Sequence, residues 1–529
     1  MPLLLPLSQG AAGIALVIGL ALLGTRQVAA AVHLLCVQSL AVTIAALALQ
    51  EPVIAALTLL VNAIGATWVL RRMMPGFGMI AEPLGSPQLG ILGGAALAVL
   101  SQAHGDAAQP FAVLLLALLL AATRRHSMVH LAALIAAQNA GALAAVRAGI
   151  PPLLVGPSFL VPVLFAGALG EDRLRLACFE AGRRLRRFLG WGHVMVAVLL
   201  LMAALAAPLD GMGAIIAPLT AGWGIAIAWA ERRRRRGLPD RIADLVHVAA
   251  MLMALAGQAP WIALPALTVA GAAALFPTVR RRLDALKLTC LGGSVALFGL
   301  YAMPLEEPAI AFGALIFGVA AIVGMVPGLA AVAGTVLLRL SLHGPWSPAA
   351  SPVLSVLCVT VMLAAGVTLL LSNRGNHPAT LLRIVQAAMI GIALTRPETQ
   401  GAAWVLILLL IVTEAAMALV RYDDPAAAGK LAATAALAGV PPLGLFPGLI
   451  LLIAGLAPVE PWLLAPVGVA SAGAMWAGLP RTPLRPSRLA MPSITWLPIA
   501  APIAACLALS AVDPVSMLHW LAALLGGMP

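Results

Sequence analysis

The residues best able to do chemistry are the few ionisable side chains inside otherwise apolar stretches. Glu414 lies in LLLIVTEAAMALV, while Arg383 and Arg339 lie in other apolar segments. A charged group at membrane depth is costly and commonly marks a proton or ion pathway. Glu414 therefore has two interpretations: a residual proton or ion site, or a structural acid paired with an Arg on a neighbouring helix. Arg383 is the obvious partner for the second.

Neutral amides form a second set of polar residues in apolar stretches. Gln138 and Asn139 lie in TRRHSMVHLAALIAAQNAG at 123–141, and Gln38 and Asn62 lie in two earlier runs. Amides hydrogen-bond across helices, at roughly 0.6–2 kcal/mol per bond in membranes. They do not carry protons as a carboxylate does, so we expect them to lock helices together without conducting.

The amino-acid composition indicates which kind of secondary structure holds these ionisable and polar side chains. Of 529 residues, 62% are hydrophobic and 9% are charged, and the mean hydropathy is +1.05. Soluble chains carry about a quarter charged residues, and a membrane helix needs about 20 apolar residues. The sequence predicts an all-α polytopic membrane protein with about 21 transmembrane helices, and it lacks the period-2 alternation of a barrel.

Basic clusters alternate with the apolar runs. Loops rich in Arg mark the cytoplasmic side of a membrane protein, which predicts an N-terminus outside and a C-terminus inside. Arg147 is an exception to the alternation. The clusters are Arg26, Arg71 with Arg72, Arg124 with Arg125, 173–187, 232–236 and 280–282.

One basic segment suggests a domain boundary. Residues 171–191, EDRLRLACFEAGRRLRRFLGW, alternate Arg with large apolar residues. They predict an amphipathic helix on the inner surface, with an ordinary basic loop as the alternative. We accordingly expect a membrane domain at 1–170, this surface helix at 171–191, and a second membrane domain at 192–529.

Cofactor motifs are missing from the sequence. The five Cys contain no CxxC pair, and no Gly-rich nucleotide-binding stretch occurs. We therefore expect no iron–sulfur cluster, metal or nucleotide on this chain. The net charge of +12 comes from Arg in short loops, which indicates contact with the lipid bilayer rather than nucleic acid.

The stretch at 123–141 has an earlier counterpart. Residues 18–39 read IGLALLGTRQVAAAVHLLCVQS. Both stretches pass through Thr-Arg into a span with an early His and a central Gln, so His33 and Gln38 correspond to His130 and Gln138. The distance from Thr to Gln differs by two residues, which makes the helix-pair repeat imperfect.

The first 190 residues resemble a known subunit. GLALLGTRQ…LLCVQSL is similar to the K-type subunit of respiratory complex I, and more so to the E subunit of the hydrogenase-4 and formate hydrogenlyase type, which duplicates that unit. The resemblance implies an Arg turn at Arg124 and Arg125, and an ionisable Glu-Asn-Gly position at Gln138-Asn139-Ala140-Gly141. It also implies an Asp one helix further, yet no Asp or Glu occurs between Ala107 and Gly170. The third-helix carboxylate of complex I would fall near Asn62.

Residues from about 190 resemble antiporter-like subunits of the same superfamily. The best marker is LAGVPPLGLFPGL at 437–449, which is similar to that family's broken helix, with Pro441 and Pro442 at the break. Leu449 stands where the family has Lys. The chain has only Lys287 and Lys430, so the resemblance implies an antiporter-like bundle with a degenerate ion path.

These resemblances give an expected function. The chain would be a non-catalytic membrane-arm subunit of a complex I-like or group 4 hydrogenase-like respiratory complex in the bacterial inner membrane. It would bind other membrane and peripheral subunits, which carry the redox chemistry, and would mainly scaffold them with possible residual proton translocation. The alternative is a stand-alone secondary transporter with a site at broken helices such as 437–449.

Overall fold

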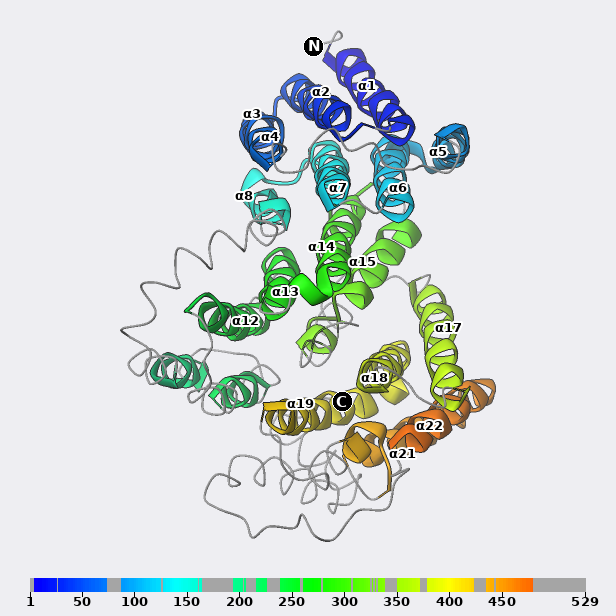
Figure 1. Ribbon diagram of the computed structural model, residues 1–529. Helices are drawn as coiled ribbons and strands as arrows, with labels where there is room; N and C mark the ends of the chain where they lie inside the picture. Colours follow the sequence, from blue (N-terminus) through cyan, green and yellow to red (C-terminus); the bar gives the residue numbers. More distant parts are fainter. Residues whose placement is uncertain are drawn as a thin grey trace. The chain divides into compact units, whose positions relative to one another are not determined.

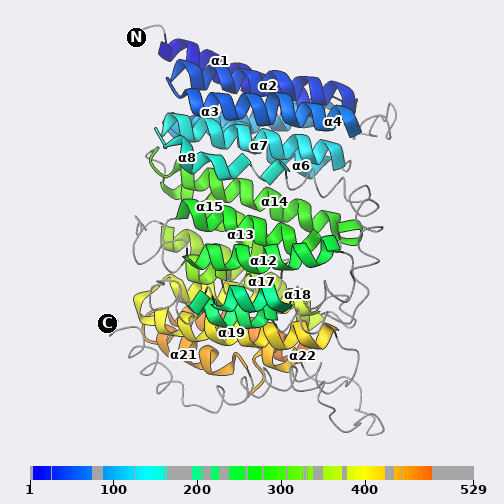
Figure 2. The same ribbon diagram turned by 90° about the vertical axis from the view of Figure 1, so that its left-hand side faces the viewer.

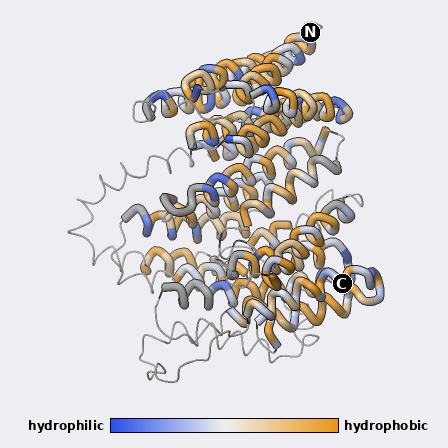
Figure 3. The backbone as a smooth tube through the Cα atoms, turned by 45° about the vertical axis from the view of Figure 1, so that its right-hand side comes forward, coloured by the Kyte–Doolittle hydropathy of each residue, from blue (hydrophilic) through white to orange (hydrophobic). Residues whose placement is uncertain are grey.

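The protein is all-α. No strand occurs in the residues that the computed structural model describes, which confirms the all-α part of the predicted fold class. Figure 3 shows that apolar residues dominate these helices. The described residues are 4–25, 27–73, 87–124, 127–159, 161–163, 194–202, 204–205, 216–225, 238–256, 260–276, 279–305, 308–323, 326, 329, 332–337, 350–371, 378–422, 434–441 and 444–478.

Within these ranges, six segments are long and apolar enough to cross a membrane, which makes this a membrane protein of the expected class. One of them, Gly90–Thr123, reverses direction at Gly105, which has a φ of 49°, and its two halves pack on each other. The other five are Leu4–Gly24, Val28–Ala48, Met128–Arg147, Asp284–Ala302 and Leu354–Leu371.

The chain packs into two compact units. The first comprises 1–174 and 278–322, and the second comprises 175–277 and 323–529. The first unit therefore contains the domain expected at 1–170 together with a later helix pair. The segment expected to form a surface helix, 171–191, lies outside the described residues.

In the first unit, α7 is the central helix and is buried along its whole apolar length. It packs against α2, α6 and α14, while α1 packs against α2 and α6. Figures 1 and 2 show these helices as a stacked bundle with similar axis directions. The elements are α1 (Leu4–Gly24), α2 (Val28–Ala48), α3 (Pro52–Leu57), η1 (Thr58–Ala66), α4 (Thr67–Met73), α5 (Pro87–Ser101), η3 (Gln102–Ala107), α6 (Ala108–Thr123), α7 (Ser127–Arg147), α8 (Pro152–Val155), η4 (Gly156–Phe159), α14 (Val279–Ala302) and α15 (Pro308–Val323).

Helices α2 and α7 end in the same way. Each has 21 residues, and each is followed by a left-handed residue, Gln50 with φ 62° and Gly149 with φ 64°. In each, the amides of the left-handed residue and of the residue after it bond back to the last turn in the Schellman pattern, and Pro then starts a short helix. When the two helices are aligned on these ends, Gln138 corresponds to Ser39. Gln38 therefore lies one position before the residue that corresponds to Gln138.

In the second unit, α12 packs on α13, α17 packs on α18 and α22, and α19 packs on α18 and α21. Pro at the start of several helices fits the first helical turn, where no amide donor is needed. The named elements are α12 (Leu238–Ala256), α13 (Pro260–Leu275), α17 (Ala350–Leu371), α18 (Pro378–Leu394), η6 (Pro397–Thr399), α19 (Gln400–Tyr422), α21 (Phe446–Leu456), η7 (Pro461–Leu463) and α22 (Leu464–Gly478).

Glycines allow α17 and α22 to touch backbone to backbone. A Cβ on Gly473 would lie 2.3 Å from the carbonyl oxygen of Gly366, and a Cβ on Gly366 would lie 2.6 Å from Ala470 Cα. In lipid, no hydrophobic driving force brings helices together. Small residues at such crossings stabilise the pair instead, because they allow close packing of the two backbones.

We therefore expect Gly473→Ala to separate these two helices and lower the free energy of unfolding by about 1–3 kcal/mol. Gly468 on the same helix is the matched control, because a Cβ there meets nothing within 4 Å. Gly468→Ala should be neutral or slightly stabilising, since Ala favours helix. Unfolding of the purified protein in detergent measures both, and equal effects would contradict the close crossing.

Candidate functional site

Four polar side chains meet in the interior of the first unit. In this amide cluster, Asn62 Nδ2 donates to Asn139 Oδ1 at 2.9 Å. Asn139 Nδ2 lies 3.0 Å from Ser39 Oγ and 3.4 Å from Gln38 Oε1. All four side chains are fully buried, so these contacts are made in a medium that strengthens them.

The cluster joins four helices. Gln38 and Ser39 come from α2, Asn62 from η1 and Asn139 from α7, and Gln38 Nε2 donates to the carbonyl of Ala15 on α1 at 3.1 Å. Every member is an amide or a hydroxyl. The arrangement can fix helices in register, but it offers no carboxylate or amine to take up a proton.

Asn62 lies in an unusual helical segment. Thr58–Ala66 forms a π-helix, a rare geometry that is frequent at functional sites. Asn62 Oδ1 has no hydrogen-bond partner among the described residues. The wide turn therefore presents one acceptor beyond those that the cluster uses.

Gln138 does not join the amide cluster. One residue along a helix rotates a side chain by about 100°, so Gln138 faces away from its neighbour Asn139. Its Nε2 lies 3.5 Å from Ser158 Oγ. The structure thus brings together Gln38, Asn62 and Asn139 from the expected set, and directs Gln138 elsewhere.

The expected Arg turn ties the two helix pairs together. The Arg124 guanidinium donates to the carbonyl of Leu23 at 3.0 Å and to that of Thr25, where the end of α1 leaves acceptors unused. His130 Nε2 donates to the Arg124 carbonyl at 2.6 Å and is buried. His33 is exposed and contacts Arg71 at 3.1 Å. Both His side chains therefore stabilise helix ends.

No protein-family model and no curated protein matches the chain. Its site must therefore be interpreted from its own geometry. Within the described ranges, no group of three His, Cys, Asp or Glu side chains is placed to hold a metal ion.

Glu414 and Arg383 form a buried ion pair in the second unit. Arg383 Nε contacts Glu414 Oε1, and NH2 lies 3.0 Å from Oε2. Their exposures are 1% for Glu414 and 3% for Arg383. This two-bond geometry is the strong form of an Arg–carboxylate contact, and it is the pairing that the sequence offered as one of two interpretations of Glu414.

The helix break predicted near 437–449 is present. Residues 434–438 are helical, and α21 begins only at Phe446. Gly439, with φ 70°, ends the first part in a Schellman pattern. Pro441 lies in the break, whereas Pro442, like Arg339, lies outside the described residues. Leu449 is buried in α21.

Two carbonyls of the helical turn before this break accept hydrogen bonds within the protein. The Ala436 carbonyl accepts from the amides of Gly439 and Leu445, and Gln386 Nε2 donates to the Leu437 carbonyl at 3.1 Å. Sequence reasoning missed Gln386, although it follows Arg383 by three residues and so shares its helix face.

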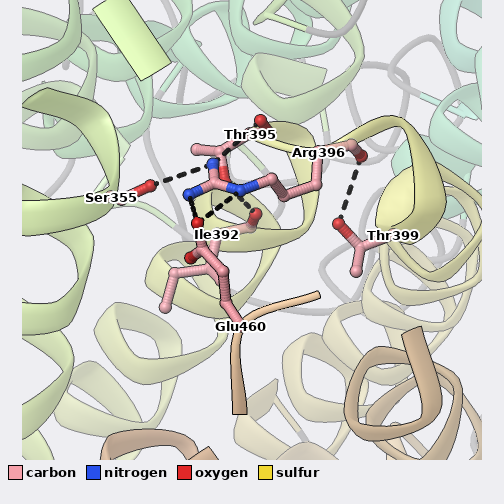
Figure 4. Close-up of polar contacts among 6 residues, drawn as sticks. All are labelled: Ser355, Ile392, Thr395, Arg396, Thr399 and Glu460. Carbon is pink, nitrogen blue, oxygen red and sulfur yellow. Dashed lines mark hydrogen bonds and ion pairs between the residues drawn. The ribbon is translucent and has the colours of Figure 1, made fainter. Parts of the chain in front are cut away.

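A second ion pair was also missed. Arg396 donates to Glu460 through Nε at 3.0 Å and through NH2, and its NH1 lies 3.4 Å from Ser355 Oγ (Figure 4). This pair is partly exposed and joins the ends of three helical elements. The only sequence signal was the placement of both charges beside Pro at span ends.

Proposed function

We propose that the chain is a scaffolding membrane-arm subunit of a complex I-like or group 4 hydrogenase-like respiratory complex. The observation that carries this proposal is the amide cluster. Where the resemblance implies a carboxylate near Asn62, the neutral amide of Asn62 bonds to Asn139. Where it implies a carboxylate next to Asn139, the chain has the buried amide of Gln138, which is directed at Ser158. Such a cluster favours a structural role, because its members do not exchange protons near neutral pH.

The buried ion pair also favours scaffolding. Glu414 engages both of its oxygens with Arg383. The pair joins α18 to α19, and loss of either partner would leave a buried charge without its counter-charge. Redox chemistry in the proposed complex belongs to partner subunits, and residual proton translocation would require groups other than this pair.

The transporter alternative receives less support. Substrate sites at broken helices use unwound carbonyls and helix ends to bind ions or substrates. Here the carbonyls of Ala436 and Leu437 accept hydrogen bonds from the protein itself. This arrangement favours a closed structural break.

The proposal includes a bacterial inner-membrane location, about 21 spans, and an N-terminus outside. Contacts at the helix ends support the alternation of basic clusters along the chain on which this topology rests. Arg124 and Arg71 contact the residues of neighbouring turns at one set of ends. Arg147, the exception in the sequence, instead donates to the Asp106 carbonyl at 2.7 Å and to Gln109. The Arg147 charge is therefore hydrogen-bonded at the opposite ends of these helices. We assign those ends to the outside of the membrane.

Purification of the tagged full-length protein from its native membranes in mild detergent tests this function. We expect stoichiometric co-purification of further membrane subunits and of a peripheral subunit with the absorption of an iron–sulfur protein. Isolation as a monomer or homodimer, with ion-driven solute uptake after reconstitution, would instead support the transporter. An Arg396→Gln variant, which changes a partly exposed helix end, is the control. It shows whether destabilisation of the chain alone causes a loss of partners.

A further inference from the structure

A small polar cavity lies beside Gln138 in the first unit. Side chains from α7, η4 and α14 line it: Ala137, Gln138, Gly141, Ser158, Ser294, Leu297 and Tyr301. It has room for about one water molecule. The Tyr301 ring closes one side, packing within 3.6 Å of where a Cβ on Gly141 would lie.

The polar groups around this cavity are acceptors. Ser158 Oγ gives its proton to the Val155 carbonyl at 2.7 Å, and Ser294 Oγ gives its proton to the Cys290 carbonyl at 3.3 Å. The Tyr301 hydroxyl donates to the Leu154 carbonyl at 3.3 Å. The Tyr301 and Ser158 side chains are also hydrogen-bonded to each other. Ser294 Oγ, whose proton is directed to the backbone, keeps its lone pairs for another donor.

Gln138 adds an acceptor that requires a donor. Its side chain is 4% exposed, and its Oε1 has no hydrogen-bond partner among the residues that the structure describes. A buried acceptor without a partner is costly. Its amide nitrogen is already directed at Ser158, so the missing donor must come from a molecule in the cavity.

We propose that this cavity is a binding site for one water molecule, which donates hydrogen bonds to Gln138 Oε1 and to Ser294 Oγ. Water fits the size, and it supplies two donors to a site that presents acceptors. A cation would also suit oxygen ligands, but no carboxylate lines the cavity to balance its charge in the membrane interior. The water then links α7 to α14, independently of the function proposed above.

A double-mutant cycle tests the water through its coupling. Gln138→Met and Ser294→Ala each remove one acceptor, and we expect each to lower the melting temperature of the full-length protein by about 1–3 °C. Once one substitution has weakened the water, the second should cost less, so the two losses should not add. If the cavity is dry, Gln138→Met removes an unpaired acceptor and should raise the melting temperature, which would overturn the proposal.

Thr289→Ala is the matched control. Thr289 lies on the same helix as Ser294, is buried, and also donates to the carbonyl four residues earlier, at 2.9 Å. It does not line the cavity, so its loss should add to that of Gln138→Met. Coupling as large as that of Ser294 would contradict a site-specific water.

A density map that resolves ordered waters gives the direct test. We expect a peak at about 2.7–3.2 Å from Gln138 Oε1, and no change in melting temperature when choline chloride replaces sodium chloride. No peak would overturn the proposal. A stabilisation that depends on sodium would also overturn it, in favour of a bound cation.

Discussion

Glu414→Gln is expected to lower the free energy of unfolding by about 3–5 kcal/mol, because it leaves the Arg383 cation buried without its counter-charge. Gln can still accept one hydrogen bond from the guanidinium, but it cannot neutralise it. Equilibrium unfolding of the full-length protein in detergent measures this loss. The exposed Glu398, close to the start of the same helix, provides the control: Glu398→Gln should change stability by less than about 0.5 kcal/mol.

The reverse test uses both partners. Adding Arg383→Gln to Glu414→Gln removes the isolated cation, so the double variant should recover part of the stability lost by the single variant. Additive losses would show that the two charges do not stabilise each other.

Asn139→Leu is expected to cost about 2–4 kcal/mol, because it removes the shared partner of the amide cluster and puts the larger methyl groups of Leu in its place. The substitution leaves Asn62 Nδ2 and Gln38 Oε1 without the contacts they make to Asn139. The exposed Gln102 supplies a comparison, and Gln102→Leu should be nearly neutral.

The same denaturation assay measures the Asn139 effect. Asn139→Leu should also reduce coupling within the cluster, so that a subsequent Asn62→Leu costs less than it does alone. Equal costs in both backgrounds would mean that the 2.9 Å contact between these side chains contributes nothing to stability.

Rare residue types made several features predictable. In a chain that is 9% charged, one interior carboxylate and one interior guanidinium have few possible partners, and Glu414 does meet Arg383. Polar groups are also rare in the apolar stretches, and this rarity identified Gln38, Asn62 and Asn139 as candidates. The helix break was predictable because Pro441 and Pro442 oppose helix continuation.

The direction in which each side chain points around its helix axis was harder to predict from the sequence. Pattern alone placed Gln138 and Asn139 together in mid-helix, but consecutive residues face different neighbours. The π-helix at Thr58–Ala66 has no distinctive residue type, and it changes the register that any periodicity assumes. The repeat likewise seemed to equate Gln38 with Gln138, whereas the helix ends align Gln138 with Ser39.

The contact between Arg383 and Glu414 also bears on how the chain enters the membrane during synthesis. The two residues are 31 positions apart on α18 and α19, helices that pack together across a short turn. Each charged side chain alone would add about 2.5–3.5 kcal/mol to the insertion of its helix. We therefore expect α18 and α19 to leave the translocon as one hairpin, in which the two charges meet before either helix contacts lipid. Two segments that are each poorly suited to insertion thus become one favourable insertion unit, and the turn at 395–399 must keep them close together.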